Sequence, residues 1–126
     1  MRGILDTSVL IAVDVGPLEG ELAISAASLA ELHYGVLVAR TDDDRATRPA
    51  RLGDVEHRFA PLAVDEQVAR GYGRLAATVE GTGRRPPARA MDLLIAATAY
   101  VHGARLYTRN AADLRGLEDL VDVVPV

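Results

Sequence analysis

The sequence contains no cysteine, and this absence excludes both a disulfide framework and a metal site built from thiolates. The three histidines, His33, His57 and His102, are scattered along the chain, so a zinc site is not expected either. No apolar run approaches the roughly 18 residues that a membrane-spanning helix needs. Asp6 interrupts the apolar start that a signal peptide would continue. These absences predict a cytoplasmic globular protein.

Lysine is also absent, so all 14 basic residues are arginine. Codon usage in a GC-rich genome is one explanation, but arginine also binds phosphate in a fork geometry that lysine lacks. The net charge of −4 argues against broad, non-specific binding of nucleic acid, which needs a basic surface. A basic rim around one local site remains compatible with this composition.

Strand-like and helix-like segments alternate along the chain. Short apolar runs predict strands at 2–6, 21–25, 60–64, 104–108 and 121–124. Apolar residues at helical spacing, together with capping signals, predict helices at 9–13, from 25 or 28 to about 40, from about 47, at 66–80 and at 88–102. The polar aspartates at 42–44 and the segment at 81–87 are expected to form loops, and residues 110–114 a turn or short helix. This order predicts an α/β fold in a single domain over residues 1–126, with a central parallel sheet of about five strands flanked by helices.

One acidic residue opens the most apolar of these helices. Residues 93–101 are apolar almost all round, which predicts a helix buried against the sheet. Asp92 precedes this stretch and shares a side with Ile95, Ala96 and Ala99 at helical spacing. A carboxylate on such a face costs several kcal/mol unless another group pairs with it. We therefore expect a cation or a polar group beside Asp92.

Four acids occupy positions where α/β folds place functional groups. Asp6 ends the first strand, Asp92 opens the buried helix, Asp113 follows the fourth strand, and Glu31 lies in the helix after the second strand. Ligands of such folds bind beyond the carboxyl ends of the strands. Several carboxylates in one small site require protons or a cation, and oxygen ligands without His or Cys select Mg²⁺ or Mn²⁺. Such a site suits metal-dependent hydrolysis of phosphodiesters.

Each acid also has a purely structural explanation. Asp6 fits a turn at a strand end, and Asp92 fits a helix N-cap. Glu31 fits a capping box with Ser28, and Asp113 fits a turn after Asn110. The hypothesis of an acidic site depends on all four acids occurring within one α/β frame.

The polar neighbours of these acids have two interpretations as well. Ser8, Thr108 and Asn110 either cap helices and turns or orient carboxylates and metal-bound water. Arg89 and Arg109 either form ordinary ion pairs or contact a substrate phosphate.

Four motifs together resemble the PIN-domain ribonucleases, specifically the toxins of VapBC-type bacterial toxin–antitoxin systems. The resemblance runs nearly from end to end of the chain. Its motifs are Leu5-Asp6-Thr7-Ser8-Val9-Leu10-Ile11, Ser28-Leu29-Ala30-Glu31-Leu32-His33-Tyr34-Gly35, the stretch from Asp92 to Ala99, and the stretch from Leu106 to Leu114.

The resemblance implies a metal-dependent endoribonuclease that uses Mg²⁺ or Mn²⁺ and acts on RNA, with tRNA or rRNA as the expected targets. Asp6 and Asp92 would be the principal metal ligands, and Glu31 and Asp113 would complete the pocket and position or activate water. Ser8, Thr108 and Asn110 would support them. The resemblance also implies a homodimer and a cognate VapB-type antitoxin that blocks the pocket.

Two segments depart from the family pattern. The connection between Asp6 and the second strand is short, so a helix usual there is expected to be cut back. Arg84-Arg85-Pro86-Pro87 replaces a more regular approach to the buried helix. RNA entry and antitoxin docking would differ at these two places.

Two other functions remain open at this stage. A catalytically silent PIN-like module would bind RNA or a partner without cutting it. A phosphatase with Asp6 as nucleophile would want a second aspartate two residues on, where this chain has Ser8.

Overall fold

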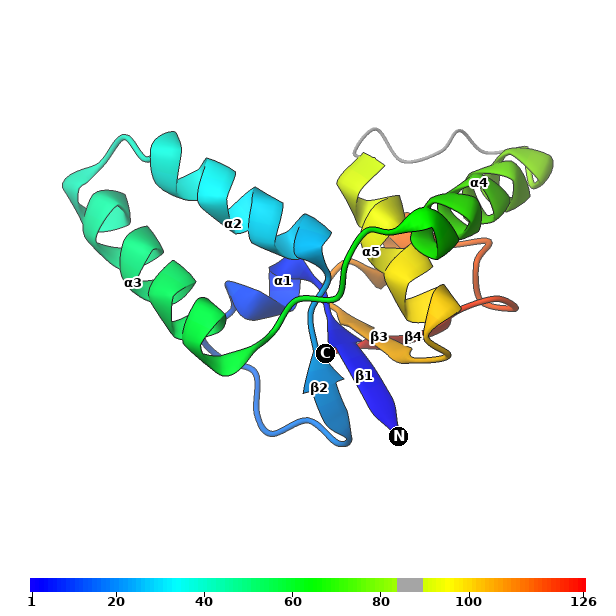
Figure 1. The fold of residues 1–126 in the computed structure, drawn as a ribbon, viewed down its shortest axis with the longest axis horizontal. Coiled ribbons are helices and arrows are strands. Elements are labelled where there is room, and N and C mark those ends of the chain that lie inside the picture. The colour runs from blue at the N-terminus through cyan, green and yellow to red at the C-terminus, as the bar shows by residue number, and fades with distance from the viewer. Residues whose placement is uncertain (84–89) are drawn as a thin grey trace.

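The chain forms a parallel β-sheet with helices around it (Figure 1). The computed structural model describes residues 1–83 and 90–126, so the predicted loop at 84–87 and Arg89 lie outside the described residues. The four strands run in the order β2-β1-β3-β4, and each neighbouring pair is parallel. Their bounds are Arg2–Leu5 for β1, Glu21–Ala23 for β2, Arg105–Thr108 for β3 and Asp122–Pro125 for β4. This arrangement confirms the predicted α/β class.

The helices begin at residues whose side chains satisfy free backbone N–H groups. Asp6, Ser25, Thr41 and Asp65 each accept a hydrogen bond from the first turn of the following helix. The helices are α1 (Thr7–Leu10), α2 (Ala26–Leu37), α3 (Asp42–Arg58), α4 (Glu66–Gly81), α5 (Ala90–Val101) and the 3₁₀ helix η1 (Ala111–Leu114). Gly103 follows α5 with a φ of 60°, the left-handed conformation that commonly ends a helix.

Two sequence predictions about elements are wrong. Residues 60–64 form no strand, and within the described residues the sheet has four strands rather than five. Leu62 makes an isolated parallel bridge with Ser25, because only one residue of this segment reaches the sheet edge. The aspartates at 42–44 are the first turn of α3 rather than a loop. Their charges are favourable there because the N-terminal end of a helix carries partial positive charge.

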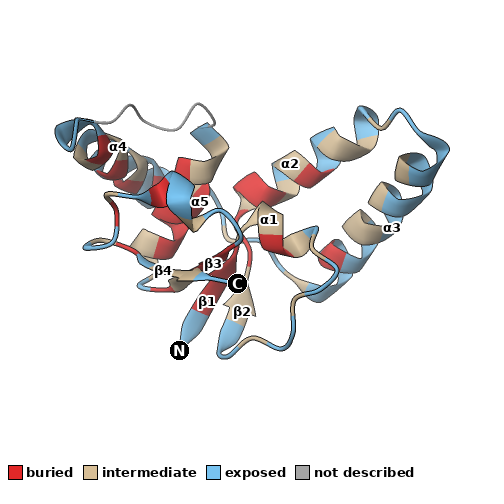
Figure 2. Ribbon diagram, turned by 180° about the vertical axis from the view of Figure 1, so that it is seen from behind, coloured by how far each residue is buried: buried red, intermediate tan, exposed pale blue. Residues whose placement is uncertain are grey.

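Apolar side chains form a core on each face of the sheet. Ile4 and Leu106 belong to the core under α4 and α5, whereas their neighbours Leu5 and Tyr107 belong to the core with α1, α2 and α3. Successive residues of a strand point to opposite faces, so β1 and β3 serve both cores. Figure 2 shows buried residues concentrated in β1, β3 and α5, and mostly exposed or intermediate residues along α3.

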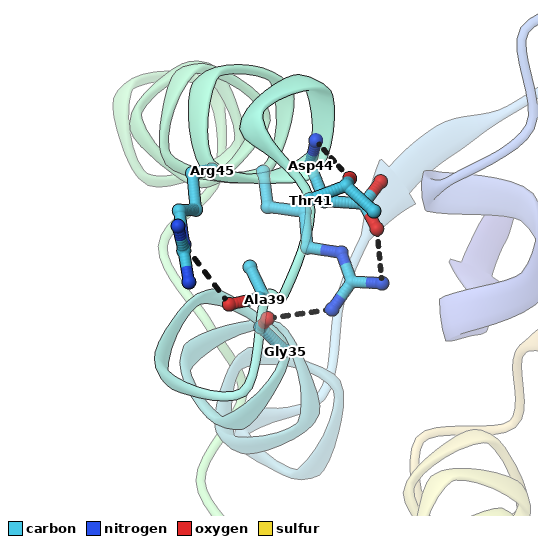
Figure 3. A network of polar contacts seen from close by, with 6 residues as sticks. Gly35, Ala39, Thr41, Asp44 and Arg45 are labelled. Carbon is cyan, nitrogen blue, oxygen red and sulfur yellow. Dashed lines mark hydrogen bonds and ion pairs between the residues drawn. The ribbon is translucent and has the colours of Figure 1, made fainter.

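The hairpin of α2 and α3 projects from the rest of the molecule (Figure 1). Arg48 of α3 donates to the Gly35 carbonyl at 2.7 Å, and Arg45 donates to the Ala39 carbonyl at 3.3 Å. Figure 3 shows this junction, including the Thr41 cap on the Asp44 N–H. These two arginines donate to carbonyls at or just after the C-terminal end of α2, and the last carbonyls of a helix have no hydrogen-bond donor within the helix itself.

None of the helices in residues 1–83 and 90–126 has the length and apolar character needed to cross a membrane.

Candidate active site

Three of the four predicted acids line one pocket at the carboxyl edge of the sheet. The chain leaves β1 at Asp6 and leaves β3 just before Asn110, and in a parallel sheet such ends lie at the same edge. We call this site the acidic pocket, and it is lined by Asp6, Asp92, Ile95, Leu106, Thr108, Asn110, Asp113 and Leu114. Its cavity volume is about 10 Å³, close to the room that one water molecule needs.

Asp6 is held by one of its two carboxylate oxygens. The Ser8 hydroxyl donates to Oδ1 at 2.5 Å, and the Val9 N–H donates to the same atom at 3.2 Å. Among the residues that the structure describes, no donor contacts Oδ2 of Asp6. The helix cap thus fixes the orientation of the carboxylate and leaves a second oxygen for a ligand in the pocket.

A longer chain of contacts ties Asp6 to the turn after β3. The backbone N–H of Arg109 donates to the Ser8 hydroxyl oxygen at 2.9 Å. The Arg109 guanidinium forms an ion pair with Asp14 at 2.5 Å, and Asp14 lies in the loop between α1 and β2. Of the two predicted interpretations of Arg109, this geometry matches an ion pair.

Two further acids reach the pocket from helices: Asp92 from α5 and Asp113 from η1. Asp92 lies half-buried in the first turn of α5, and Asp113 lies exposed on η1. Thr108 is fully buried, and its hydroxyl oxygen accepts from the Asn110 N–H at 2.9 Å. This contact fixes the turn that carries Asp113 toward the pocket, since η1 begins directly after Asn110.

Glu31 lies in a neighbouring cavity rather than in the acidic pocket. We call this space the helical cavity: it lies between α1, α2 and α3, has a volume of about 430 Å³, and is lined in part by Thr7, Ile11, Glu31, Tyr34, Arg48 and Arg51. The Thr7 hydroxyl donates to Oε1 of Glu31 at 2.6 Å. Because Thr7 follows Asp6 in the chain, this contact connects the two spaces.

The structural alternatives for Glu31 and Ser8 do not hold. The N-cap of α2 is Ser25, which accepts from the Ala27 N–H at 3.1 Å, so Ser28 and Glu31 form no capping box. Similarly, Asp6 rather than Ser8 caps α1.

The donor set of the acidic pocket fits a hard divalent cation. The carboxylates of Asp6, Asp92 and Asp113 line the pocket, and Mg²⁺ favours carboxylate oxygens with several retained waters. Within residues 1–83 and 90–126, no three His, Asp or Glu side chains are close enough to form a complete metal cage. Binding through one or two carboxylates plus water is the mode that this arrangement suits.

Comparisons with known proteins agree with this architecture. The family model described as "PIN domain" matches residues 4–117. Ribonuclease VapC5 of Mycobacterium tuberculosis is 42% identical over 114 residues, which cover 86% of this chain and 82% of that protein. Ribonuclease VapC4 of the same organism is 31% identical over 115 residues, covering 86% of each.

A solved structure gives the same result in three dimensions. The crystal structure of VapBC-5 from M. tuberculosis, a member of the VapBC family of toxin–antitoxin systems, superposes with a TM-score of 0.84 and 37% identity. The match covers 99% of this chain and 97% of that one. The protein therefore belongs to the PIN-domain family and, within it, to the VapC ribonuclease toxins.

Two residues beside the site escaped the sequence analysis. Thr7 holds Glu31, and Asp14 holds Arg109. For Thr7 the signal was available, because a hydroxyl directly after a strand-end acid lies next to the site. No signal points to Asp14, since it is 95 residues from its partner and lies in an irregular loop.

Proposed function

We propose that this VapC-type toxin is an endoribonuclease that works in the cytoplasm with a divalent cation in the acidic pocket, held by Asp6 and Asp92 with Asp113 beside them. The observation that carries the proposal is the convergence of three carboxylates, from three distant parts of the chain, on one small pocket. Such a concentration of negative charge is stable when a cation balances it. The expected ion is Mg²⁺ or Mn²⁺, and the expected substrate is RNA, with tRNA or rRNA as the first candidates.

The position of each residue suggests its role in metal binding or in orienting the site. Asp6 and Asp92 would hold the cation, Asp6 through the oxygen that its cap leaves open, and Asp113 would complete the pocket. A divalent cation bound there supplies Lewis-acid activation of the phosphate and a lower pKa for a coordinated water. Ser8 fixes the Asp6 carboxylate, and Thr108 fixes the turn that carries Asp113. Glu31, held by Thr7 at the adjoining wall, is placed to orient water or the RNA.

Metal-dependent cleavage tests this proposal. The purified protein should cut labelled RNA in Mg²⁺ or Mn²⁺, and EDTA should stop it. Asp6→Asn and Asp92→Asn should each abolish cleavage while leaving the circular dichroism spectrum unchanged. Asp43→Asn, which changes an exposed acid on α3, is the matched control and should cut at the wild-type rate.

Two results would overturn the proposal. Cleavage at the wild-type rate by either pocket variant would remove the assignment of the metal ligands. RNA binding without cleavage under all metal conditions would identify a binding module instead.

The partner is proposed from the same relatives. VapBC-5 is a toxin–antitoxin system, and we infer that this chain pairs with a cognate VapB-type antitoxin that covers the acidic pocket. We also infer that the toxin forms a homodimer. Co-expression with the antitoxin should abolish RNA cleavage, and light scattering of the free toxin and of the complex should give the stoichiometry.

A further inference from the structure

The helical cavity holds an arginine that has no hydrogen-bond or ion-pair partner within residues 1–83 and 90–126. Of its two arginines, Arg48 contacts the Gly35 carbonyl at 2.7 Å and Asp44 at 3.3 Å. Arg51 lies one turn further along α3, is half-buried, and makes no hydrogen bond or ion pair with any residue that the structure describes. A partly desolvated guanidinium without a counter-ion favours an anionic ligand, and phosphate matches its fork geometry.

An exposed aromatic ring lines the same cavity. Tyr34 of α2 is 68% exposed although it is one of only five aromatic residues in the chain. Apolar side chains of Ile11, Leu32 and Val38 also line the cavity. A flat ring beside apolar walls suits an unstacked nucleobase, because every base has an apolar face and stacks on aromatic side chains.

The cavity adjoins the acidic pocket through covalent and hydrogen-bonded links. Asp6 lines the acidic pocket and Thr7 lines the helical cavity, and Thr7 holds Glu31 at 2.6 Å. The two spaces therefore adjoin at Asp6 and Thr7. A phosphodiester chain carries, at successive positions, the base and the phosphate that Tyr34 and Arg51 would bind.

We propose that the helical cavity binds the nucleotide next to the cleaved phosphate of a single-stranded RNA, with Tyr34 stacking on the base and Arg51 holding the adjoining phosphate. This inference rests on the proposed ribonuclease function. Single-stranded RNA is the substrate because a base inside a duplex cannot leave its stack to reach Tyr34 without loss of pairing. An apolar peptide would use the walls of the cavity, but it would leave the charge of Arg51 without an anion.

The test compares RNA binding and cleavage by matched variants of the full-length toxin. A fluorescein-labelled single-stranded RNA of mixed sequence is titrated in EDTA, where cleavage is blocked, and KM and kcat are then measured in Mg²⁺. Tyr34→Leu should weaken binding and raise KM by about 5- to 150-fold, the range of one lost base–aromatic stack. Tyr34→Phe keeps the ring and should bind RNA as the wild type does. The kcat should stay within about twofold in both.

Arg51→Gln should weaken binding and also change its dependence on salt. Loss of one phosphate contact to a single strand reduces the slope of log K against log salt by about 0.7. Two exposed residues serve as controls. Leu37→Ala alters an 84% exposed side chain one turn beyond Tyr34, and Arg58→Gln alters an arginine at the far end of α3 that pairs with Asp54.

The outcomes separate the two levels of the proposal. Unchanged RNA affinity in Tyr34→Leu and Arg51→Gln, in a protein that cleaves RNA, overturns this inference and leaves the ribonuclease function intact. Equal losses in the Leu37→Ala control overturn it as well. Loss of antitoxin binding with unchanged RNA binding would assign the cavity to the protein partner instead. A wild-type protein that neither binds nor cleaves RNA would remove the proposed function itself.

Discussion

The hydroxyl of Thr7 donates a hydrogen bond of 2.6 Å to Oε1 of Glu31. This contact joins the first turn of α1 to α2 across 24 residues of sequence. It places the fourth acid beside the acidic pocket without placing it inside.

Thr7→Val should lower kcat for RNA cleavage while changing the free energy of unfolding by about 1 kcal/mol or less. Valine keeps the shape of threonine but cannot donate to Glu31, and one part-buried hydrogen bond contributes about that much. Thr7→Ser should keep most of the activity. Steady-state kinetics and urea denaturation measure the two effects. Thr47→Val, an exposed change on α3, is the control, and a wild-type rate in Thr7→Val would show that Glu31 needs no such anchor.

The ion pair between Asp14 and Arg109 should act on activity more than on stability. The pair is partly exposed, so its loss should cost below about 1 kcal/mol of unfolding free energy. It also steadies the turn whose backbone N–H holds Ser8, and Ser8 holds Asp6. Asp14→Asn and Arg109→Gln should therefore lower the cleavage rate by similar factors, and the double variant should be no worse than either.

The same double-mutant cycle distinguishes the two hypotheses for Arg109. If Arg109→Gln loses activity and Asp14→Asn does not, the guanidinium acts on the RNA phosphate directly. Equal and non-additive losses assign it to the support of the turn.

Two serines at the start of α2 should respond to alanine in opposite directions. Ser28 is fully buried and its hydroxyl has no hydrogen-bond partner among the described residues, which costs about 1–3 kcal/mol. Ser28→Ala should therefore leave stability unchanged or raise it by up to about 1 kcal/mol. Ser25 caps α2 and accepts from Thr98 at 3.0 Å, so Ser25→Ala should lower stability by about 1–2 kcal/mol. Urea midpoints decide between these directions, and a large loss in Ser28→Ala would contradict the first.

Gly3→Ala should destabilise the sheet by about 1–3 kcal/mol, the usual cost of overpacking. A Cβ at Gly3 would lie 2.6 Å from Cε2 of Tyr107. That ring cannot withdraw easily, because its hydroxyl donates to the Glu19 carbonyl at 2.8 Å. Gly73→Ala is the control: it lies in α4 with no atom within 4 Å of the added Cβ, and it should raise stability by up to about 1 kcal/mol. Thermal melts of both variants measure the difference, and an unchanged melting temperature in Gly3→Ala would contradict the prediction.

Part of the acidic pocket could be predicted from the sequence, because the carboxyl ends of parallel strands lie at the same edge of a sheet. Asp6 and the turn after β3 come from neighbouring parallel strands, so their approach follows once the strands are recognised. Asp92 was recognisable as an acid at the start of an apolar helix. The place of Glu31 was harder to predict, because it depends on whether α2 begins after Ser25 or after Ser28. Moving the first residue of α2 by three positions changes which neighbouring group the side chain of Glu31 can reach.

Other features were beyond the sequence for physical reasons. Residues 60–64 have a strand-like composition, but only Leu62 pairs, and its partner Ser25 lies two residues beyond the end of β2. The acidic start of α3 is stabilised by the helix dipole and the Thr41 cap, which outweigh the low helix propensity of aspartate. Whether Arg51 pairs with an acid depends on side-chain distances within a cavity that Glu31 and Asp44 also line, and only the folded chain reveals these distances.

The pairing of β1 with β3 has a consequence during protein synthesis. Asp6 is synthesised about a hundred residues before β3, one of the two strands beside it, and before η1, which carries Asp113. A nascent chain therefore has no assembled acidic pocket until η1 has been made. The time needed to synthesise those residues is time in which an antitoxin can already be waiting.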